Sequence, residues 1–350
     1  MVMPSFEQKS LGIEAGLKAP ARRWDEDLAP GGPRTGERCF TQPLHFISMK
    51  NSPVADEVII IGGSYAGLSA AMALGRSRRS VLVLDAGLPR NRFAPHAHNL
   101  LLHDGAAPAD LAARARQQVA AYPTVVLRAT VATHAARLPT GGFEVTTTHG
   151  LLRAKKLLLA TGLRDELPPV PGFAECWGKS VIHCPFCHGY EVADQPTGLW
   201  LNGEMVGHLA TLLANWTREL TVFTNGPATF GADVRQQLLA QNVPLEETPV
   251  AELLHREGQL SAVRLADGRH RPLPVLYAGL PWQQASTLPA ALGCELTERG
   301  LLRIDEYYQT SVPDVYAAGD CCTLAHQLAQ AIAAGNLAGV GLSRQLIGAI

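Results

Sequence analysis

The 350-residue chain has almost no excess of charge of one sign, with 30 Lys and Arg against 31 Asp and Glu and a formal net charge of −1. Without a basic or acidic excess, its charge gives no support for binding to nucleic acid or to an anionic membrane surface. It also lacks an apolar run long enough to cross a bilayer. We therefore expect neither nucleic acid nor a membrane as a partner.

The N-terminus lacks a basic segment followed by a continuous apolar stretch, so we expect no secretory signal. Cysteines are few and mostly scattered, and their odd number fits one redox-active pair in a reducing cytoplasm better than a disulfide scaffold. The seven are Cys39, Cys176, Cys184, Cys187, Cys294, Cys321 and Cys322. With 47% hydrophobic and 17% charged residues, the chain is globular and long enough for two domains.

Residues 1–52 are rich in Pro, Gly, Arg and Glu and show no sustained hydrophobic period. This composition predicts a poorly ordered N-terminal extension, and Met49 offers an alternative start just before the first strand. A functional docking tail is the alternative interpretation.

From residue 57 onward, apolar strands alternate with helical patterns, which predicts an α/β fold. The first strand–helix–strand unit covers residues 58–61, 68–74 and 81–85. A second covers residues 198–201, 208–216 and 220–223. Each predicts a right-handed βαβ unit, so we expect two Rossmann-like, doubly wound nucleotide-binding domains.

The sequence GGSYAG at residues 62–67 follows the first strand and opens the first helix. Gly62 supplies a tight turn, Gly67 lets helix and strand approach, and the helix N-terminus attracts a pyrophosphate. Ser64 stands where a middle glycine belongs, which weakens the fit without abolishing it. Asp85 ends the second strand, where a carboxylate reaches ribose hydroxyls. The predicted dinucleotide site comprises Gly62, Ser64, Tyr65, Ala66, Gly67 and Asp85.

Two later segments favour FAD over NAD as the dinucleotide. The apolar strand 157–159 ends in a turn of small residues, and the strand end YAAGD at 316–320 offers a carboxylate for a ribityl chain. The helix that follows presents its N-terminal side to the flavin ring. These segments add Ala160, Thr161, Gly162, Gly319, Asp320, Gln330 and Ala331 to the predicted FAD site.

Cys184 and Cys187 lie in the run HCPFCHGYE at residues 183–191. Two thiols at this spacing can close a small disulfide and exchange two electrons with a neighbouring flavin. His188 can accept the proton of an attacking thiol and return it to a leaving one. His183 and His188 would complete a zinc set with the two thiols. Residues so close in sequence rarely converge on one ion, however, so no metal is expected.

Together these motifs resemble the thioredoxin-reductase-like, FAD-dependent pyridine nucleotide-disulfide oxidoreductases, over roughly residues 55–350. The segment CPFCHGYE resembles the gliotoxin-type dithiol oxidases more than the thioredoxin reductases, whose motif ends Cys-Asp-Gly. The resemblance implies a discontinuous FAD domain (53–166 and 284–350), an inserted NAD(P)-binding-like domain carrying the CxxC (167–283), and a homodimer. It also implies that Cys187 faces the flavin and Cys184 meets the substrate.

The second nucleotide turn departs from the thioredoxin reductase pattern. Asn202 stands where its first glycine belongs and Glu204 where its second does. A carboxylate at a helix N-terminus repels a pyrophosphate, and residues 223–227 contain no Arg or Lys for a 2′-phosphate. NADPH is thus a possible cofactor with a degenerate site, and we expect a domain that keeps its fold but has lost much of its NADPH affinity. In the milder interpretation, Glu204 turns to solvent and NADPH binding is merely weak.

The predicted function is an FAD-dependent thiol/disulfide oxidoreductase that cycles the Cys184–Cys187 pair, oxidising dithiols with oxygen or another acceptor. One alternative is an NADPH-dependent thioredoxin-disulfide reductase, and another is a flavin-binding redox sensor without turnover. The expected partner is a small-molecule dithiol or disulfide, or a thioredoxin-like protein. Three histidines in the loop before Gly105 (His96, His98 and His103) are each expected to make backbone contacts rather than to act in catalysis.

Overall fold

The computed structural model describes residues 56–348. The chain divides into Met1–Asn51 and Ser52–Ile350, and only the second part is described below. The prediction of a poorly ordered extension over residues 1–52 therefore lies outside the described residues. None of the helices in the described range is long and apolar enough to span a membrane.

The first sheet has seven strands in the order β3-β2-β1-β6-β5-β4, with β17 also paired to β6. The strands β1, β2, β3, β6 and β17 run parallel, whereas β4 and β5 are antiparallel additions. Their bounds are β1 Asp56–Ile61, β2 Val81–Asp85, β3 Val125–Ala129, β4 Ala132–Arg137, β5 Phe143–Thr147, β6 Gly150–Leu159 and β17 Val315–Ala317. Apolar runs form β1, β2 and the end of β6 because both faces of the parallel part are covered.

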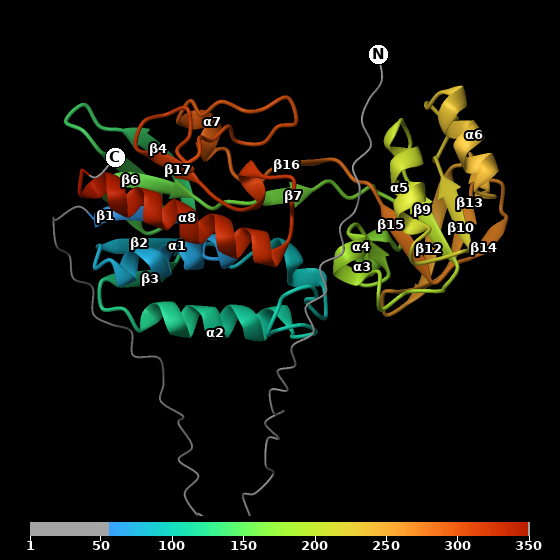
Figure 1. Cartoon of the computed structure of the whole chain (residues 1–350), viewed down its shortest axis with the longest axis horizontal. Coiled ribbons are helices and arrows are strands. Elements are labelled where there is room, and N and C mark those ends of the chain that lie inside the picture. The colour runs from blue at the N-terminus through green and yellow to red at the C-terminus, as the bar shows by residue number, and fades with distance from the viewer. Residues whose placement is uncertain (1–55, 349–350) are drawn as a thin grey trace, which may run out of the picture. The chain divides into compact units, whose positions relative to one another are not determined.

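Three helices cover one face of this sheet: α1 (Tyr65–Arg76), α2 (Pro108–Ala120) and α8 (Leu328–Leu346). Figure 1 shows α8 running beside α1. Their backbones approach so closely that a Cβ at Gly335 would collide with the backbone of Ala66. The opposite face packs a second apolar cluster beneath the short helix α7 (Leu288–Ala291) and β4–β5. The two clusters hold β1, β6 and β17 rigidly between them.

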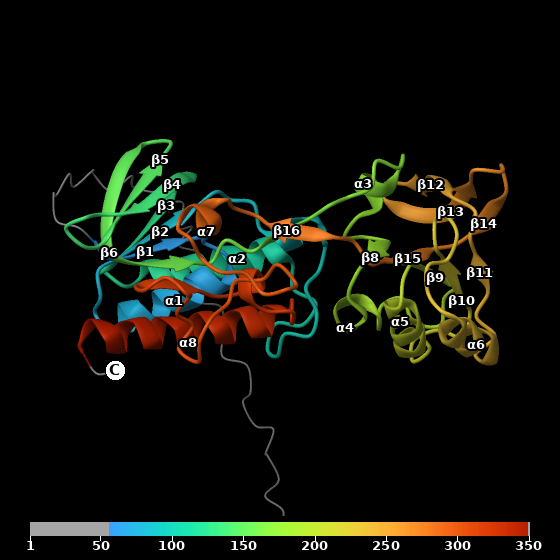
Figure 2. The same ribbon diagram turned by 90° about the horizontal axis from the view of Figure 1, so that it is seen from above.

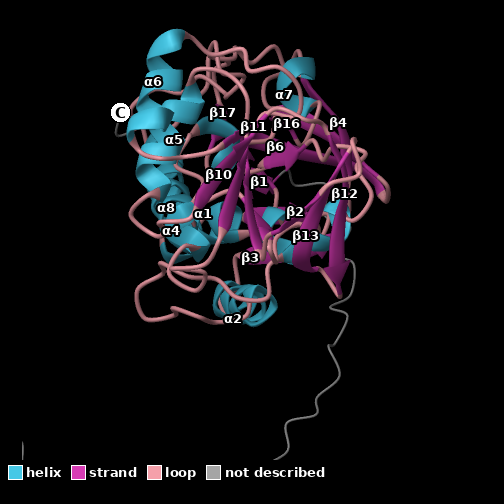
Figure 3. Ribbon diagram, turned by 90° about the vertical axis from the view of Figure 1, so that its right-hand side faces the viewer, coloured by secondary structure: helices cyan, strands magenta, loops and turns pink. Residues whose placement is uncertain are grey.

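The second sheet has five parallel strands in the order β11-β10-β9-β15-β8. These are β8 Val181–Ile182, β9 Thr197–Trp200, β10 Leu220–Phe223, β11 Leu245–Glu246 and β15 Val275–Ala278. Helices α5 (Met205–Leu213) and α6 (Ala232–Ala240) cover one face. An antiparallel sheet of β12 (Val250–Arg256), β13 (Gln259–Leu265) and β14 (His270–Pro272) covers the other with α3 (Phe173–Cys176) (Figure 2). Figure 3 shows α5 and α6 on one side of β10.

A short antiparallel ribbon joins the two sheets. It consists of β7 (Leu163–Asp165) and β16 (Trp282–Gln284), with Trp282 opposite Asp165 and Gln284 opposite Leu163. All strands of the second sheet lie between these two segments in sequence, while the first sheet takes strands from both sides of them. The predicted α/β class with two Rossmann-like sheets is thus confirmed.

Two helix boundaries differ from the prediction. The first helix begins at Tyr65 instead of residue 68, and α5 covers 205–213 instead of 208–216. Each helix starts directly at the turn after its strand, and its first turn contains a glycine, Gly67 in α1 and Gly207 in α5, which is unfavourable within a helix. Trp216 lies beyond α5 because its ring is used elsewhere, against Phe186.

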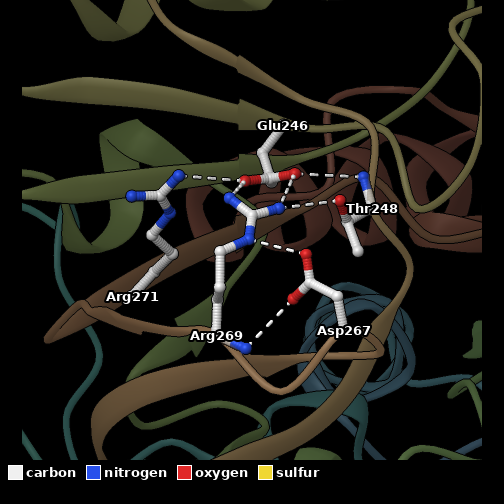
Figure 4. A network of polar contacts seen from close by, with 5 residues as sticks. All are labelled: Glu246, Thr248, Asp267, Arg269 and Arg271. Atoms are coloured by element: carbon white, nitrogen blue, oxygen red, sulfur yellow. Dashed lines mark hydrogen bonds and ion pairs between the residues drawn. The ribbon is translucent and has the colours of Figure 1, made fainter.

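A network of polar contacts ties β11 to the hairpin that ends in β14 (Figure 4). Glu246 accepts hydrogen bonds from Arg269 (2.9 and 3.1 Å), from Arg271 (3.2 Å) and from the Thr248 backbone N–H (3.1 Å). Burial alone would raise the pKa of Glu246, but Arg269 and its other donors lower it to about 2. Both guanidinium groups are therefore committed to a carboxylate of their own domain.

Candidate redox site

The glycine turn lies where β1, β6 and β17 end side by side. Gly62 has a φ of +111°, and a Cβ there would collide with the Ala160 carbonyl, while one at Gly67 would collide with the Gly62 carbonyl. A Cβ at Gly319 would lie 2.9 Å from that of Ala66. The fold thus brings Gly62, Ala66, Gly67, Ala160 and Gly319 together, and only glycine fits the turn at residue 62.

Ser64 and Tyr65 open helix α1 differently. Ser64 is the extended N-cap residue, and its hydroxyl makes no capping bond within residues 56–348. Tyr65 is buried, and its hydroxyl donates to the Pro108 carbonyl at 3.2 Å. The helix N-terminus therefore keeps backbone N–H groups for an anion, whereas Tyr65 secures the neighbouring α2.

Asp85 ends β2 beside a cavity of about 450 Å³. Its carboxylate accepts hydrogen bonds from the Gly87 N–H and from Arg116, both at 3.1 Å. The cavity lies at the carboxyl ends of β2 and β3, the edge where doubly wound sheets bind nucleotides. Its walls also include Ala129, Thr130, Val131, Thr148 and His149, which the sequence motifs do not indicate because they come from separate loops.

Asp320 is held by a residue that sequence reasoning missed. Arg90, in the 3-10 turn η1 (Arg90–Phe93), donates from Nη1 to Asp320 at 3.1 Å. It also makes a two-pronged contact with Asp165 of the ribbon, at 2.9 Å from Nε and 2.5 Å from Nη2. The exposed side-chain fractions are only 16% for Arg90, 10% for Asp165 and 19% for Asp320. Arg90 thus links the segment after β17, which contains Asp320, to the β7–β16 ribbon between the sheets.

The residues present fit FAD. Besides the glycine turn and the cavity at Asp85, several buried polar atoms lack a hydrogen-bond partner within the described part, among them Asn91 Nδ2, Thr161 Oγ1 and His326 Nε2. Buried polar groups of this kind are normally satisfied by a ligand or by water. Gln330 and Ala331 lie in the first turn of α8, both half-buried, with Ala331 packed in the cluster around Tyr65. A pyrophosphate, a ribityl chain and a polar ring edge would satisfy this set.

A disulfide joins Cys184 and Cys187, whose Cα atoms are 5.3 Å apart. Cys184 is the N-cap of the one-turn helix α4 (Pro185–His188), so Cys184, Cys187 and His188 lie on a single turn. Trp216 supports this turn, because its ring meets the Phe186 ring edge-on at 5.5 Å and leaves no room for a Cβ at Gly189. The disulfide therefore lies on a short helix that packs against Trp216.

The histidines on either side of the pair are both shifted toward the neutral form. Burial lowers the pKa of His188, the nearby His98 lowers it further, and the Glu191 carboxylate opposes both. Desolvation by neighbouring protein atoms and the Arg90 guanidinium lower the pKa of His183 to about 4, although the residue as a whole is exposed at the surface. The His183 ring also stacks on Trp177 at 5.7 Å. A neutral imidazole at position 188 can accept a thiol proton.

The three loop histidines do not behave alike. His96 contacts the Gly105 carbonyl through Nδ1 at 3.0 Å, as expected, and His103 is exposed. The expectation is wrong for His98, whose Nδ1 lies 3.3 Å from Glu191 Oε1 and 3.6 Å from Asp104 Oδ2. Its ring faces two carboxylates instead of a backbone carbonyl.

In the second nucleotide turn, between β9 and α5, the side chains of Asn202 and Glu204 form hydrogen bonds with the neighbouring backbone. Asn202 donates from Nδ2 to the Pro227 carbonyl (2.9 Å) and accepts the Thr229 N–H at Oδ1 (2.8 Å). Glu204 does not simply turn to solvent, because its Oε1 accepts the Gly231 N–H at 3.0 Å. The N–H groups of Thr229 and Gly231 are thus already bonded to the chain.

A site that fits FAD and a redox-active disulfide, each carried by its own Rossmann-like sheet, define a flavin-dependent disulfide oxidoreductase. The chain matches the model of the pyridine nucleotide-disulphide oxidoreductase family over residues 56–336, and it belongs to that family.

Individual relatives cover nearly the whole described chain. Thioredoxin reductase aclD from Aspergillus oryzae is 32% identical over 302 residues, which are 83% of this chain and 96% of that protein. The crystal structure of an oxidoreductase from Agrobacterium tumefaciens is 38% identical, with a TM-score of 0.78 over 84% of this chain and 99% of the other. The crystal structure of HlmI is 33% identical, with a TM-score of 0.80 over 84% and 93%.

Proposed function

We propose that this protein oxidises dithiols to disulfides through the Cys184–Cys187 pair and FAD, with oxygen or another acceptor taking the electrons. One observation carries the direction of the reaction. The second nucleotide turn is filled by Asn202 and Glu204, while the disulfide and His188 form a complete thiol-exchange site. Such a protein takes its electrons from a thiol substrate rather than from NADPH.

The residues of α4 divide the exchange between them. One sulfur of the substrate dithiol attacks Cys184, and Cys187 leaves as a thiolate. The second substrate sulfur then attacks the first, which closes the substrate disulfide and releases Cys184. His188 takes up a proton from the attacking thiol. Two electrons now reside on the cysteine pair, and bound FAD supplies the acceptor that passes them to oxygen or another oxidant.

The alternative function is NADPH-dependent reduction of a disulfide, as in a thioredoxin reductase. In its favour, the second sheet keeps the β9–α5–β10 unit of a nucleotide-binding domain. Against it, Glu204 places a carboxylate at the start of α5, where a pyrophosphate would compete with it for the Gly231 N–H. In either direction the substrate is a small-molecule dithiol or disulfide, or a thioredoxin-like protein.

An anaerobic titration of the purified yellow protein tests the proposal. A dithiol is expected to bleach the visible flavin absorbance with up to two equivalents per flavin, because the Cys184–Cys187 disulfide also takes up two electrons. NADPH is expected to leave the absorbance unchanged. Rapid and saturable bleaching by micromolar NADPH would instead identify a disulfide reductase. Adding oxygen after bleaching by the dithiol should restore the absorbance if oxygen is the acceptor.

A further inference from the structure

His98 lies in an unusual electrostatic setting. Its side chain is 17% exposed, and its Nδ1 is buried with no hydrogen bond of good geometry to any described residue. That atom faces two carboxylates, Glu191 at 3.3 Å and Asp104 at 3.6 Å. Small rotations of these side chains would complete a hydrogen bond between the ring nitrogen and either carboxylate.

The two acids come from different parts of the chain. Asp104 belongs to the loop that carries His98, and it is fixed there by accepting the Asn99 N–H at 2.7 Å. Reciprocal backbone bonds between Ala97 and the Gly105–Ala106 segment, each at 2.9 Å, close the same loop. Glu191 instead follows the redox turn, three positions after His188. The loop next to the FAD-type site therefore contacts the segment that bears the proton acceptor.

Few other charged groups face His98. From its own loop, Asp104 faces it and the His96 ring lies 6.3 Å away, centroid to centroid. From the redox segment, Glu191 and His188 face it. Tyr277 of β15 is the remaining neighbour of Glu191, and its buried hydroxyl has no partner among residues 56–348. Among these groups, His188 is the one that lies on the redox turn itself.

The geometry points to His98 and Glu191 as a positioning pair for His188 in the thiol–disulfide exchange. Glu191, anchored by His98, fixes the end of the redox turn against the loop of the other sheet. His188 then holds its ring where the substrate S–H can transfer its proton to it. The proton leaves His188 for the departing Cys187 thiolate or for solvent, so the pair itself is neither oxidised nor reduced. This inference rests on the proposed function.

The two members of the pair act on His188 in opposite directions. Beyond the effect of burial, His98 lowers the pKa of His188 and Glu191 raises it. Removing Glu191 alone leaves the effect of His98 unopposed, and removing His98 alone leaves that of Glu191. A residue with a merely structural role would not produce opposite shifts.

The test compares Glu191→Gln and His98→Gln with His103→Gln, a matched control that makes the same change at an exposed position of the same loop. Anaerobic bleaching of the FAD-loaded protein by one fixed dithiol is followed from pH 5 to pH 9 by stopped flow. With Glu191→Gln the rising limb of the rate should move to lower pH, and with His98→Gln to higher pH. Each should also lower the plateau rate about tenfold, as loss of an oriented base does.

The double variant should lose less than the product of the two single losses, because the residues act as one pair. The inference would be overturned if the rising limbs of the pH–rate profiles of the two single variants coincide with those of wild type and His103→Gln. It would also be overturned if both limbs shift in the same direction. If His98→Gln fails to retain FAD, Glu191→Asp is compared with Glu191→Gln instead. Because Glu191→Asp keeps a carboxylate, its pH–rate profile should recover the rising limb of wild type. Failure to recover it would count against the pair. Absence of bleaching in the wild type would instead refute the proposed function.

Discussion

At the scale of single residues, the chemistry depends on two cysteines that differ in their place on α4. Cys184 caps the helix and Cys187 lies in its last turn, next to His188. Replacing Cys187 by serine should leave FAD bound but abolish bleaching by a dithiol, because the exchange loses its leaving thiolate. Cys294→Ser, which alters a buried thiol near Thr310 in the first sheet's core, is the control and should bleach normally. Normal turnover by Cys187→Ser would show that the pair is not the electron carrier.

Residues joined by local sequence were predictable, and those joined by the fold were not. In the CxxC run and in the turn from Gly62 to Gly67, all residues of the motif lie within a few positions of one another, so each motif is recognisable from the sequence. Arg90 contacts Asp165 and Asp320, and His98 contacts Glu191, across long stretches of chain. In sequence, His98 is indistinguishable from His96 and His103, because only the folded loop determines which ring meets a carboxylate.

At the scale of elements, the proposed choice of electron donor depends on the turn between β9 and α5. Glu204 bonds the Gly231 N–H and Asn202 bonds Thr229, so the turn is closed from within. Replacing both residues by glycine should free these donors and remove a carboxylate that repels phosphate. NADPH should then bind about tenfold more tightly, a change of about 1.4 kcal/mol.

A titration of flavin bleaching against NADPH measures this change, with Glu219→Gln as the control because Glu219 lies at the far end of the same βαβ unit, just before β10. An unchanged NADPH response in the double glycine variant would mean that the absence of basic residues after β10 limits binding. The turn would then be a consequence of lost affinity and not its cause.

Strands were predicted better than helices and far better than the small antiparallel sheet. Buried parallel strands are continuous apolar runs in the sequence, so the observed bounds of β2 and β10 are those predicted from such runs. Helices α1 and α5 start three residues earlier than the pattern indicated, because each first turn contains a glycine, Gly67 in α1 and Gly207 in α5, and glycine is a poor helix former. Strands β12–β14 bury few of their residues, and β14 buries none, so no apolar run separated them from loops in the sequence.

At the scale of the whole chain, β17 returns to the first sheet after a long excursion through the second. Pairing of β17 with β6 places Asp320 at the same edge as the glycine turn, although more than half of the described residues separate them in sequence. The motif that follows β17 indicated this return, but not the buried charges that fix it. Arg90, with its two carboxylates, ties together the first sheet, the ribbon and the loop after β17.

Arg90→Gln should therefore lower the free energy of unfolding more than the loss of one partner of an exposed ion pair would. It leaves Asp165 and Asp320 buried and facing each other without a cation, which costs about 3 kcal/mol of unfolding free energy. Burial would raise the pKa of Asp165, yet Arg90 holds it below its ordinary value, so loss of Arg90 leaves the effect of burial largely unopposed. Arg153→Gln is the matched control, because Arg153 is 63% exposed in its pair with Glu144 and its loss should cost less than about 1 kcal/mol. Urea unfolding of both variants, saturated with FAD, measures the two costs. Equal costs would mean that the network is hydrated and contributes little, and the ribbon would then be held by the pairing of β7 with β16 alone.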